Sequence, residues 1–291
     1  MELPSDIILT SPRNASTVVL TRDAPQGLEI FLVKRHGLSD VLGGAHVFPG
    51  GKLDDSDVQL DAHQYLDLDD GSLHLALGEP DLPHAMARGL YVAALRESFE
   101  ECGVLLAANV SAQVTEKAMT LMQQGVAFNQ ILADLSLRLS TSALMPWSRW
   151  ITPKLVSVSS KRFDTRFFVA SLPPEQVAQH DNHEATESVW LTPRAALQQY
   201  WDGGIELAPP QIMSLSHLSR YANVASVLAA ARTQMPPLIC PEPFERDGER
   251  VLCYPGDTQH SVAARAMPGP SRLTYRNRRF EPEGGFNALL T

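Results

Sequence analysis

Residues 86–103, MARGLYVAALRESFEECG, constrain the fold of this chain more than any other segment. Most of these residues favour a helix, and Gly103 stands where a glycine can end one in the left-handed conformation. At 100° per residue, Glu97, Glu100 and Glu101 lie at about 0°, 300° and 40°, so three carboxylates share one face. The opposite face carries Val92, Leu95, Phe99 and Cys102. The segment therefore predicts an amphipathic helix with its apolar face on a core.

Short segments rich in β-branched and aromatic residues predict a sheet around this helix. STVVLTR (16–22) and EIFLVKR (29–35) are separated by the turn-forming DAPQG and should form a hairpin. A helix should begin after ESVWL, with Thr192 as its N-cap and Pro193 in its first turn. Further strands are expected at 45–48, 148–153, 165–172 and 187–191, and a further helix over 211–232. Strands and helices alternating in this way predict an α/β fold.

We expect one main domain over residues 10–235. The acidic segment 58–84 is interrupted by Gly and Pro and should be a partly helical surface insertion. Residues 111–140 show two amphipathic patterns split at Gly125, which predicts a small helical subdomain. Residues 236–291 hold eight of the 21 prolines and should be an irregular extension, packed on the domain or trailing it, with one strand at RLTYRNRRF (272–280).

Composition narrows the possible partners. The 291 residues carry 24 Lys and Arg against 33 Asp and Glu, and the net charge of -9 argues against a nucleic-acid or anionic-membrane surface. The three cysteines lie far apart in sequence, in no C-x-x-C pair, so neither a disulfide framework nor a zinc knuckle is expected. The start, MELPSDIILT, lacks the features of a signal peptide, and no stretch approaches a membrane span. We therefore expect a soluble, cytoplasmic protein.

The three glutamates admit two interpretations. An ordinary solvated face is the usual role of an acidic cluster. However, like charges three or four residues apart cost a helix roughly 0.2 to 0.5 kcal/mol per pair, and a divalent cation would offset that repulsion. Carboxylate oxygens without cysteine ligands suit Mg²⁺ or Mn²⁺.

A second motif favours the metal interpretation. HVFPGGKLDD (46–55) places a Pro49-Gly50-Gly51 turn before acidic residues, and together with RESFEECGV (96–104) it resembles the signature of Nudix hydrolases, G-x5-E-x7-R-E-U-x-E-E-x-G-U with U aliphatic. Arg96, Glu97, Glu100, Glu101, Gly103 and Val104 match its second half. Three positions depart from it: Asp57 replaces the first Glu, Ser98 replaces an aliphatic residue, and 38 residues (58–95) replace the seven-residue spacer.

A split signature of this kind is similar to that of the branch containing the peroxisomal coenzyme A diphosphatases. GAHVFPGGKLD, RFDTRFFVA and LAPPQ support the same branch. The resemblance covers most of residues 15–230 and implies a Nudix α/β/α sandwich with a mixed β-sheet, enlarged by helical insertions.

The resemblance also implies roles for particular residues. Glu97, Glu100 and Glu101 would hold the metal with the backbone carbonyl of Gly51, and one of the glutamates could act as base. Arg96 would complete the catalytic set by pairing with Asp57 or Asp54. Arg35, Gly50 and Gly51 would contact the substrate. Glu184 or Glu187 could instead supply the base, although exposed surface positions explain both about as well.

The reaction implied is attack by water on a nucleoside diphosphate linked to another moiety. Coenzyme A or acyl-coenzyme A, cleaved to 3',5'-ADP and 4'-phosphopantetheine, is the leading substrate. ADP-ribose, NADH and dinucleoside polyphosphates remain alternatives, as does a nucleotide-binding regulator without turnover, although intact metal-binding carboxylates count against a regulator. Arg272, Arg276, Arg278 and Arg279 could contact phosphates or simply lie on a solvated strand. The sequence leaves the oligomeric state open.

Overall fold

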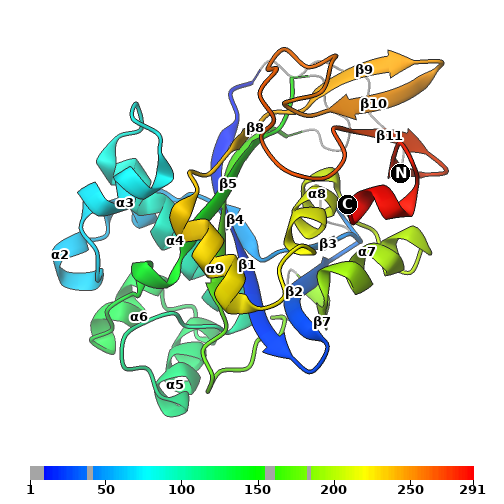
Figure 1. Cartoon of the computed structure of the whole chain (residues 1–291). Helices are drawn as coiled ribbons and strands as arrows, with labels where there is room; N and C mark the ends of the chain where they lie inside the picture. Colours follow the sequence, from blue (N-terminus) through cyan, green and yellow to red (C-terminus); the bar gives the residue numbers. More distant parts are fainter. Residues whose placement is uncertain (1–9, 38–41, 155–160, 182–184) are drawn as a thin grey trace.

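A mixed eight-stranded sheet forms the centre of the computed structural model, which describes residues 10–37, 42–154, 161–181 and 185–291 (Figure 1). Its main order is β3-β2-β1-β6-β5-β8, with β4 paired to β1 and β7 paired to β2. Strands β1 and β6 run parallel, as do β5 and β8, while the other pairs are antiparallel. The strands are β1 (Arg13–Ala24), β2 (Gly27–Arg35), β3 (His46–Val47), β4 (Gly50–Lys52), β5 (Met145–Ile151), β6 (Phe163–Ser171), β7 (Ala185–Leu191) and β8 (Leu238–Ile239).

Most of these strands lie where the sequence predicts them. The β1–β2 hairpin is confirmed, with Thr21 opposite Ile30 and Ala24 opposite Gly27. The alternation of side chains along β1 divides the core into two layers. Val18 and Leu20 belong to a first apolar cluster on one face of the sheet, and Val19 belongs to a second cluster on the other face. The two clusters form because successive residues of a strand face opposite sides of the sheet.

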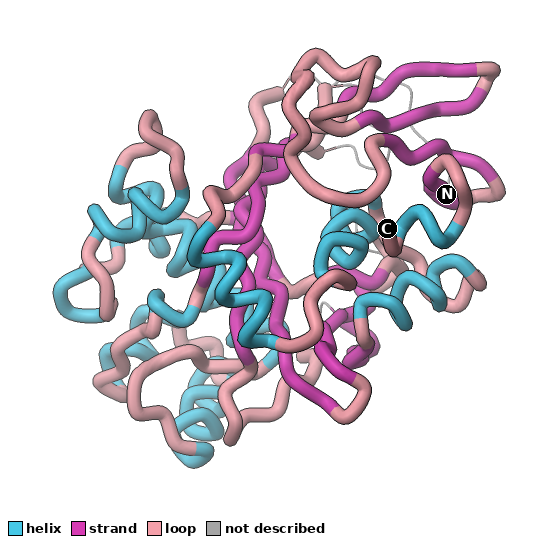
Figure 2. The backbone as a smooth tube through the Cα atoms, viewed as in Figure 1, coloured by secondary structure: helices cyan, strands magenta, loops and turns pink. Residues whose placement is uncertain are grey.

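Helices cover both faces of the sheet (Figure 2). Helix α4 (His84–Cys102) packs in the first apolar cluster, and α7 (Pro193–Trp201), α8 (Pro209–Leu218) and α9 (Val224–Thr233) pack in the second. Helix α7 begins as predicted, since the Thr192 side chain accepts a hydrogen bond from the Ala195 N–H. The helix expected over 211–232 is wrong in one respect. It is two helices, because Asn223 and Ser226 form a capping box that starts α9.

Helix α4 ends at Gly103 as predicted, in the left-handed conformation (φ 69°). However, it is not an amphipathic helix with one free face. Most of its residues are buried, including Arg96 and Glu101, because α1 (Asp55–Gln59) and α3 (Asp70–Leu77) pack on its outer side. The helix is thus enclosed between the sheet and the segment that splits the signature.

The segment 58–84 contains α2 (Ala62–Tyr65) and α3, and it contributes to the core. Leu60, Leu66, Leu73 and Leu77 are buried in the first cluster. At its end, Glu79 accepts hydrogen bonds from Arg166 at 2.8 and 2.5 Å. Arg166 is 3% exposed, and Arg149 and Asp164 join the same ion-pair network. The inserted segment is therefore tied to the sheet by buried leucines and by buried charge.

Two further helices follow α4, as the sequence predicts. They are α5 (Ala112–Gln123) and α6 (Phe128–Asp134), separated near Gly125. A short 3-10 turn, η1 (Thr141–Ala143), leads from them into β5.

The expectation of an irregular C-terminal extension is wrong. After β8 the chain forms a separate four-stranded antiparallel sheet and then a 3-10 turn, η2 (Phe286–Leu289). Two tight turns explain the sheet: Asp247-Gly248 and Asn277-Arg278 all have positive φ, the conformation that two-residue hairpins require. The strand expected over 272–280 is consequently a hairpin. The strands are β9 (Glu242–Arg246), β10 (Glu249–Cys253), β11 (Arg272–Arg276) and β12 (Arg279–Pro282).

Within the described ranges, no helix is both long and apolar enough to cross a membrane.

Candidate active site

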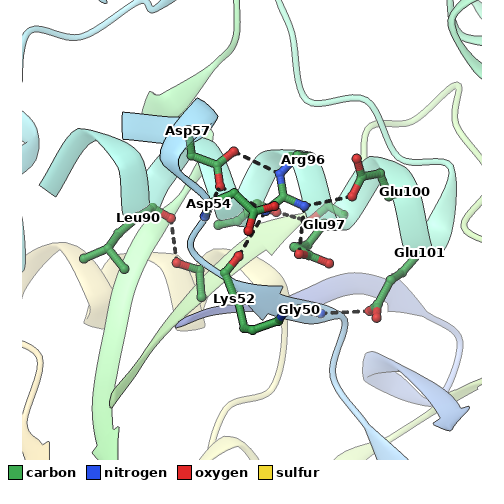
Figure 3. Close-up of polar contacts among 12 residues, drawn as sticks. Gly50, Lys52, Asp54, Asp57, Leu90, Arg96, Glu97, Glu100 and Glu101 are labelled. Carbon is green, nitrogen blue, oxygen red and sulfur yellow. Dashed lines mark hydrogen bonds and ion pairs between the residues drawn. The ribbon is translucent and has the colours of Figure 1, made fainter. Parts of the chain in front are cut away.

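Arg96 lies at the centre of the polar contacts around the predicted signature (Figure 3). Its Nε and Nη2 donate to the two carboxylate oxygens of Asp57, each at 2.9 Å, and Nη2 also donates to the Lys52 carbonyl at 3.0 Å. Its Nη1 donates to Glu97 Oε1 and Glu100 Oε2, both at 2.8 Å. The predicted pairing of Arg96 with Asp57 is therefore present, and it joins the two halves of the split signature.

Asp57 suits this position because α1 holds it in place. Its carboxylate accepts a hydrogen bond from the Asp54 N–H at 2.9 Å as part of a capping box, and its side chain is fully buried. Asp54 itself lies 3.7 Å from Arg96 and is mostly exposed. The shorter aspartate can replace the glutamate of the signature because the inserted segment begins with a helix that brings it to the arginine.

Burial and charge act in opposite directions on this cluster. Burial alone would lower the pKa of Arg96, but hydrogen bonds to Asp57 and the nearby carboxylates raise that pKa above its ordinary value. Burial raises the pKa of Glu100, with Asp57 and Asp54 adding to the shift and Arg96 opposing it. Arg96 thus remains a cation and offsets part of the repulsion among the carboxylates.

Gly50 and Gly51 lie in strand β4 rather than in a turn, opposite Thr17 and Ser16 of β1. The Gly50 N–H donates to Glu101 Oε2 at 2.9 Å. A Cβ on Gly51 would lie 2.2 Å from Glu97 Oε1, and one on Gly50 would lie 2.3 Å from the Ser16 carbonyl oxygen. The two glycines are needed because helix α4 and strand β1 both approach β4 this closely.

The three glutamates differ in their surroundings. Glu101 is only 6% exposed, so it is not the surface residue that helix periodicity predicts. It accepts a hydrogen bond from the Gly50 N–H, whereas Glu97 and Glu100 both accept from Arg96. Throughout the part of the chain that the structure describes, no three His, Cys, Asp or Glu side chains converge as a metal site. The donors nevertheless fit a hard cation, because they are carboxylate oxygens.

A cleft of about 510 Å³ opens beside Glu97, Gly50 and Gly51. Arg35, predicted to contact substrate, also lines it, whereas Arg96, Glu100 and Glu101 are not among its described lining residues. Four aromatic residues line the cleft: Phe48, Trp150, Phe163 and Phe167. Four basic residues line the cleft: Arg13, Arg35, Lys52 and Lys161.

Sequence reasoning missed much of this cleft. Arg13 begins β1, Lys161 lies two residues before the parallel strand β6, and Gln211 lies in the first turn of α8. Pro241 and Leu252 come from the C-terminal segment that had been expected to be irregular. Gln211 ends the LAPPQ segment noted in the sequence, but no local pattern links the other positions, because only the fold brings them together.

Other predicted candidates lie elsewhere. Glu187 pairs with Lys34 at 3.4 Å and is not among the described cleft residues, and Glu184 lies outside the described residues. Burial lowers the pKa of His46, which favours its neutral form.

Three of the four arginines of 272–280 pair with carboxylates of the C-terminal sheet or of the loop between β10 and β11. Arg272 contacts Asp257, Arg276 contacts Glu249 and Arg279 contacts Glu281. This pairing favours the interpretation as strand residues over phosphate contacts.

Comparison with known proteins supports the family suggested by this geometry. The model of the NUDT19 Nudix domain matches residues 74–218, which include Arg96 and the three glutamates. The chain is 30% identical to an acyl-coenzyme A diphosphatase NUDT19 of Xenopus laevis, over 67% of this chain and 61% of that protein. It is 25% identical to the putative nudix hydrolase 7 of Caenorhabditis elegans, over 86% of this chain and 75% of that protein.

A solved structure agrees with the sequence relatives. The fold matches the crystal structure of a NUDIX hydrolase from Alicyclobacillus acidocaldarius with a TM-score of 0.61 and 25% identity, over 78% of this chain and 98% of that one. The mixed sheet between helices is thus the predicted Nudix architecture. Taken together, the matched domain, the relatives and the shared fold show that this chain belongs to the Nudix hydrolase superfamily.

Proposed function

We propose that this protein hydrolyses a nucleoside diphosphate linked to another moiety, with coenzyme A or acyl-coenzyme A as its substrate. The products would be 3',5'-ADP and 4'-phosphopantetheine or its acyl derivative. The observation that carries the proposal is the cleft, where Glu97 of the signature and four basic side chains line one space. The Xenopus laevis relative is an acyl-coenzyme A diphosphatase, which supports the substrate.

The basic residues of the cleft suit a substrate with several phosphates. The whole chain has a net charge of -9, yet Arg13, Arg35, Lys52 and Lys161 gather around the cleft. Positive side chains attract phosphate oxygens and position them beside the reacting groups. A basic cleft in an otherwise acidic protein favours a phosphorylated small molecule over a neutral one as the ligand.

Glu97, Glu100, Glu101 and the Gly51 carbonyl are the groups that we propose to hold Mg²⁺ or Mn²⁺. Such an ion would neutralise the diphosphate oxygens and make water a stronger nucleophile. Glu101 accepts from the Gly50 N–H through Oε2, and the remaining lone pairs of its carboxylate would be the ones to hold the ion. Arg96 would then keep Glu97 and Glu100 oriented, since both accept from the same nitrogen.

We propose that the diphosphate bond is cleaved in the cleft. Water attacks one phosphorus, the bond to the bridging oxygen breaks, and a carboxylate takes the proton of the attacking water. Of the three glutamates, Glu97 is the one that lines the cleft, so we assign it the position nearest the substrate. Gly50 and Gly51 line the cleft beside Glu97, and we propose that they contact the substrate there.

We also propose a reducing compartment, the cytoplasm, since Cys102, Cys240 and Cys253 are all free thiols and Cys102 and Cys253 are buried.

Product analysis by mass spectrometry tests the proposal. The protein is incubated with Mg²⁺ or Mn²⁺ and, in parallel, with coenzyme A, an acyl-coenzyme A, ADP-ribose, NADH and diadenosine tetraphosphate. We expect 3',5'-ADP from the coenzyme A compounds and its loss when EDTA removes the metal. Cleavage of a different compound would replace the substrate, and no cleavage at all would favour a binding protein.

Glu101→Gln provides the site control. The amide keeps an acceptor for the Gly50 N–H but loses the charge, so we expect a folded protein with turnover reduced roughly hundredfold or more. Glu116→Gln, an exposed residue on α5, is the matched control and should be fully active. Unchanged turnover in Glu101→Gln would contradict the assignment of the metal ligands.

A further inference from the structure

Gln211 is a buried polar residue in the wall of the cleft. Its side chain comes from the first turn of α8, and the residue is 6% exposed. Its Oε1 is buried and accepts no hydrogen bond from any residue that the structure describes. Buried amide oxygens are nearly always paired, so an unpaired one beside a cleft indicates a partner supplied by a ligand.

The first turn of α8 is poorly suited to bind a phosphate. Helix N-termini attract anions through their free backbone N–H groups. Here Pro209 and Pro210 occupy the first two positions and have no N–H, and Ala208 offers no side-chain cap. The Ile212 N–H already donates to the Ala208 carbonyl at 3.0 Å. The recognition group at this end of the cleft is therefore the neutral amide of Gln211.

The same cleft is also lined by aromatic side chains, including Phe48, Trp150 and Phe167. The ring centroids of Phe48 and Trp150 each lie 6.2 Å from that of Phe167. The polar edge of the indole is already used, because Trp150 Nε1 donates to Ser148 Oγ at 3.1 Å. A flat heteroaromatic group can pack against such rings, and its polar edge would then need the amide.

We propose that Gln211 recognises the adenine base of the substrate. A glutamine amide offers one acceptor and one donor side by side, which match the amino group and adjacent ring nitrogen of adenine. Oε1 accepts from the amino group, which supplies the partner missing in the cleft. The terminal amide torsion is soft, so the side chain can turn to the base at little cost. This assignment rests on the proposed function and locates the base beside the first turn of α8.

The affinity of the protein for nucleotide products, measured by titration calorimetry, tests base recognition by Gln211 separately from catalysis. The ligands are adenosine 3',5'-bisphosphate and the corresponding purine riboside 3',5'-bisphosphate, which lacks the amino group. We expect the wild-type protein to bind the adenine compound about tenfold more tightly. Gln211→Met keeps the size of the side chain and removes the amide. It should bind the adenine compound roughly tenfold to a hundredfold more weakly and no longer distinguish the two.

Kinetics and a matched variant complete the test. With coenzyme A, Gln211→Met should raise KM by a similar factor and change kcat less than threefold. Gln198→Met removes a surface amide that bonds Asp202 on α7 and should behave as wild type. If Gln211→Met does not fold, the two ligands are still compared on the wild-type protein.

Equal affinity of the wild-type protein for both compounds overturns the role of Gln211, as does an unchanged preference in Gln211→Met. Turnover of coenzyme A together with either result leaves the proposed function intact. Absence of both turnover and adenine-nucleotide binding overturns the proposed function and the base site together.

Discussion

Gly50→Ala and Gly51→Ala, the same change at two adjacent positions, should affect different properties: the first should lower stability and the second should lower turnover. At Gly51 the three nearest atoms to an added Cβ are Oε1, Cδ and Oε2 of Glu97, at 2.2, 2.5 and 2.7 Å. At Gly50 they include the Ser16 carbonyl oxygen at 2.3 Å and the Thr17 Cα at 2.7 Å. The first methyl group thus meets the end of a side chain, and the second meets the backbone of β1.

The magnitudes follow from what has to move. Carbon contacts are comfortable at about 3.5 to 4 Å, so Gly51→Ala must displace the Glu97 carboxylate by about 1 Å or more. A displacement of about 1 Å at a reacting group can reduce turnover about hundredfold. A glutamate can rotate, so the free energy of unfolding should change by only about 1 kcal/mol. Gly50→Ala must separate β4 from β1, and overpacking of this kind costs about 1–3 kcal/mol.

Urea unfolding and steady-state turnover of the two variants form the assay. We expect Gly51→Ala to unfold near the wild-type midpoint with turnover reduced about hundredfold, and Gly50→Ala to unfold at clearly lower urea. Turnover of Gly51→Ala within threefold of wild type would refute the reasoning about Glu97. Equal losses of stability in both variants would refute the distinction between side-chain and backbone contacts.

Three further changes test the charged and buried groups. Asp57→Ala leaves the buried guanidinium of Arg96 without its bidentate partner, and urea denaturation should show a loss of about 3 kcal/mol; a loss under about 1 kcal/mol would contradict that pairing. Glu79→Ala should cost about as much by the same measurement, since Arg166 is buried, and wild-type stability would show that the inserted segment is not anchored there. Burial, with a smaller contribution from Arg220, lowers the pKa of His217 to about 4, so the unfolded chain binds the extra proton first. Stability should be constant above about pH 6.5 and fall by up to about 3 kcal/mol between pH 6.5 and 4, a decline that His217→Gln should remove.

Local signals were sufficient for much of this fold. The β1–β2 hairpin, the end of α4 at Gly103 and the Thr192 cap of α7 all depend on residues within a few positions of one another. The spacing of the three glutamates was equally local. The pairing of Arg96 with Asp57 across 38 intervening residues could be predicted only through the resemblance to a family.

Other features could not be predicted from periodicity. Helix α4 shows an apolar face and an acidic face in sequence, yet its acidic side is partly covered because the inserted segment packs on it. In the C-terminal segment, Asp247-Gly248 between short strands is a hairpin signal, but the many prolines outweighed it. The unpaired oxygen of Gln211 has no sequence signal, since it depends on which groups the fold leaves out of reach.

The contact between Arg96 and Asp57 also sets how strongly the length of the intervening chain is constrained. The entropy of closing a loop grows only with the logarithm of its length, so replacing seven residues by 38 costs about 1.5 kcal/mol. One fully buried leucine contributes a comparable amount, and residues 58–84 alone bury four. The number of residues between the two halves of the signature therefore has little net effect on the free energy of folding. A family built on this contact can lengthen or shorten that segment while its catalytic geometry stays the same.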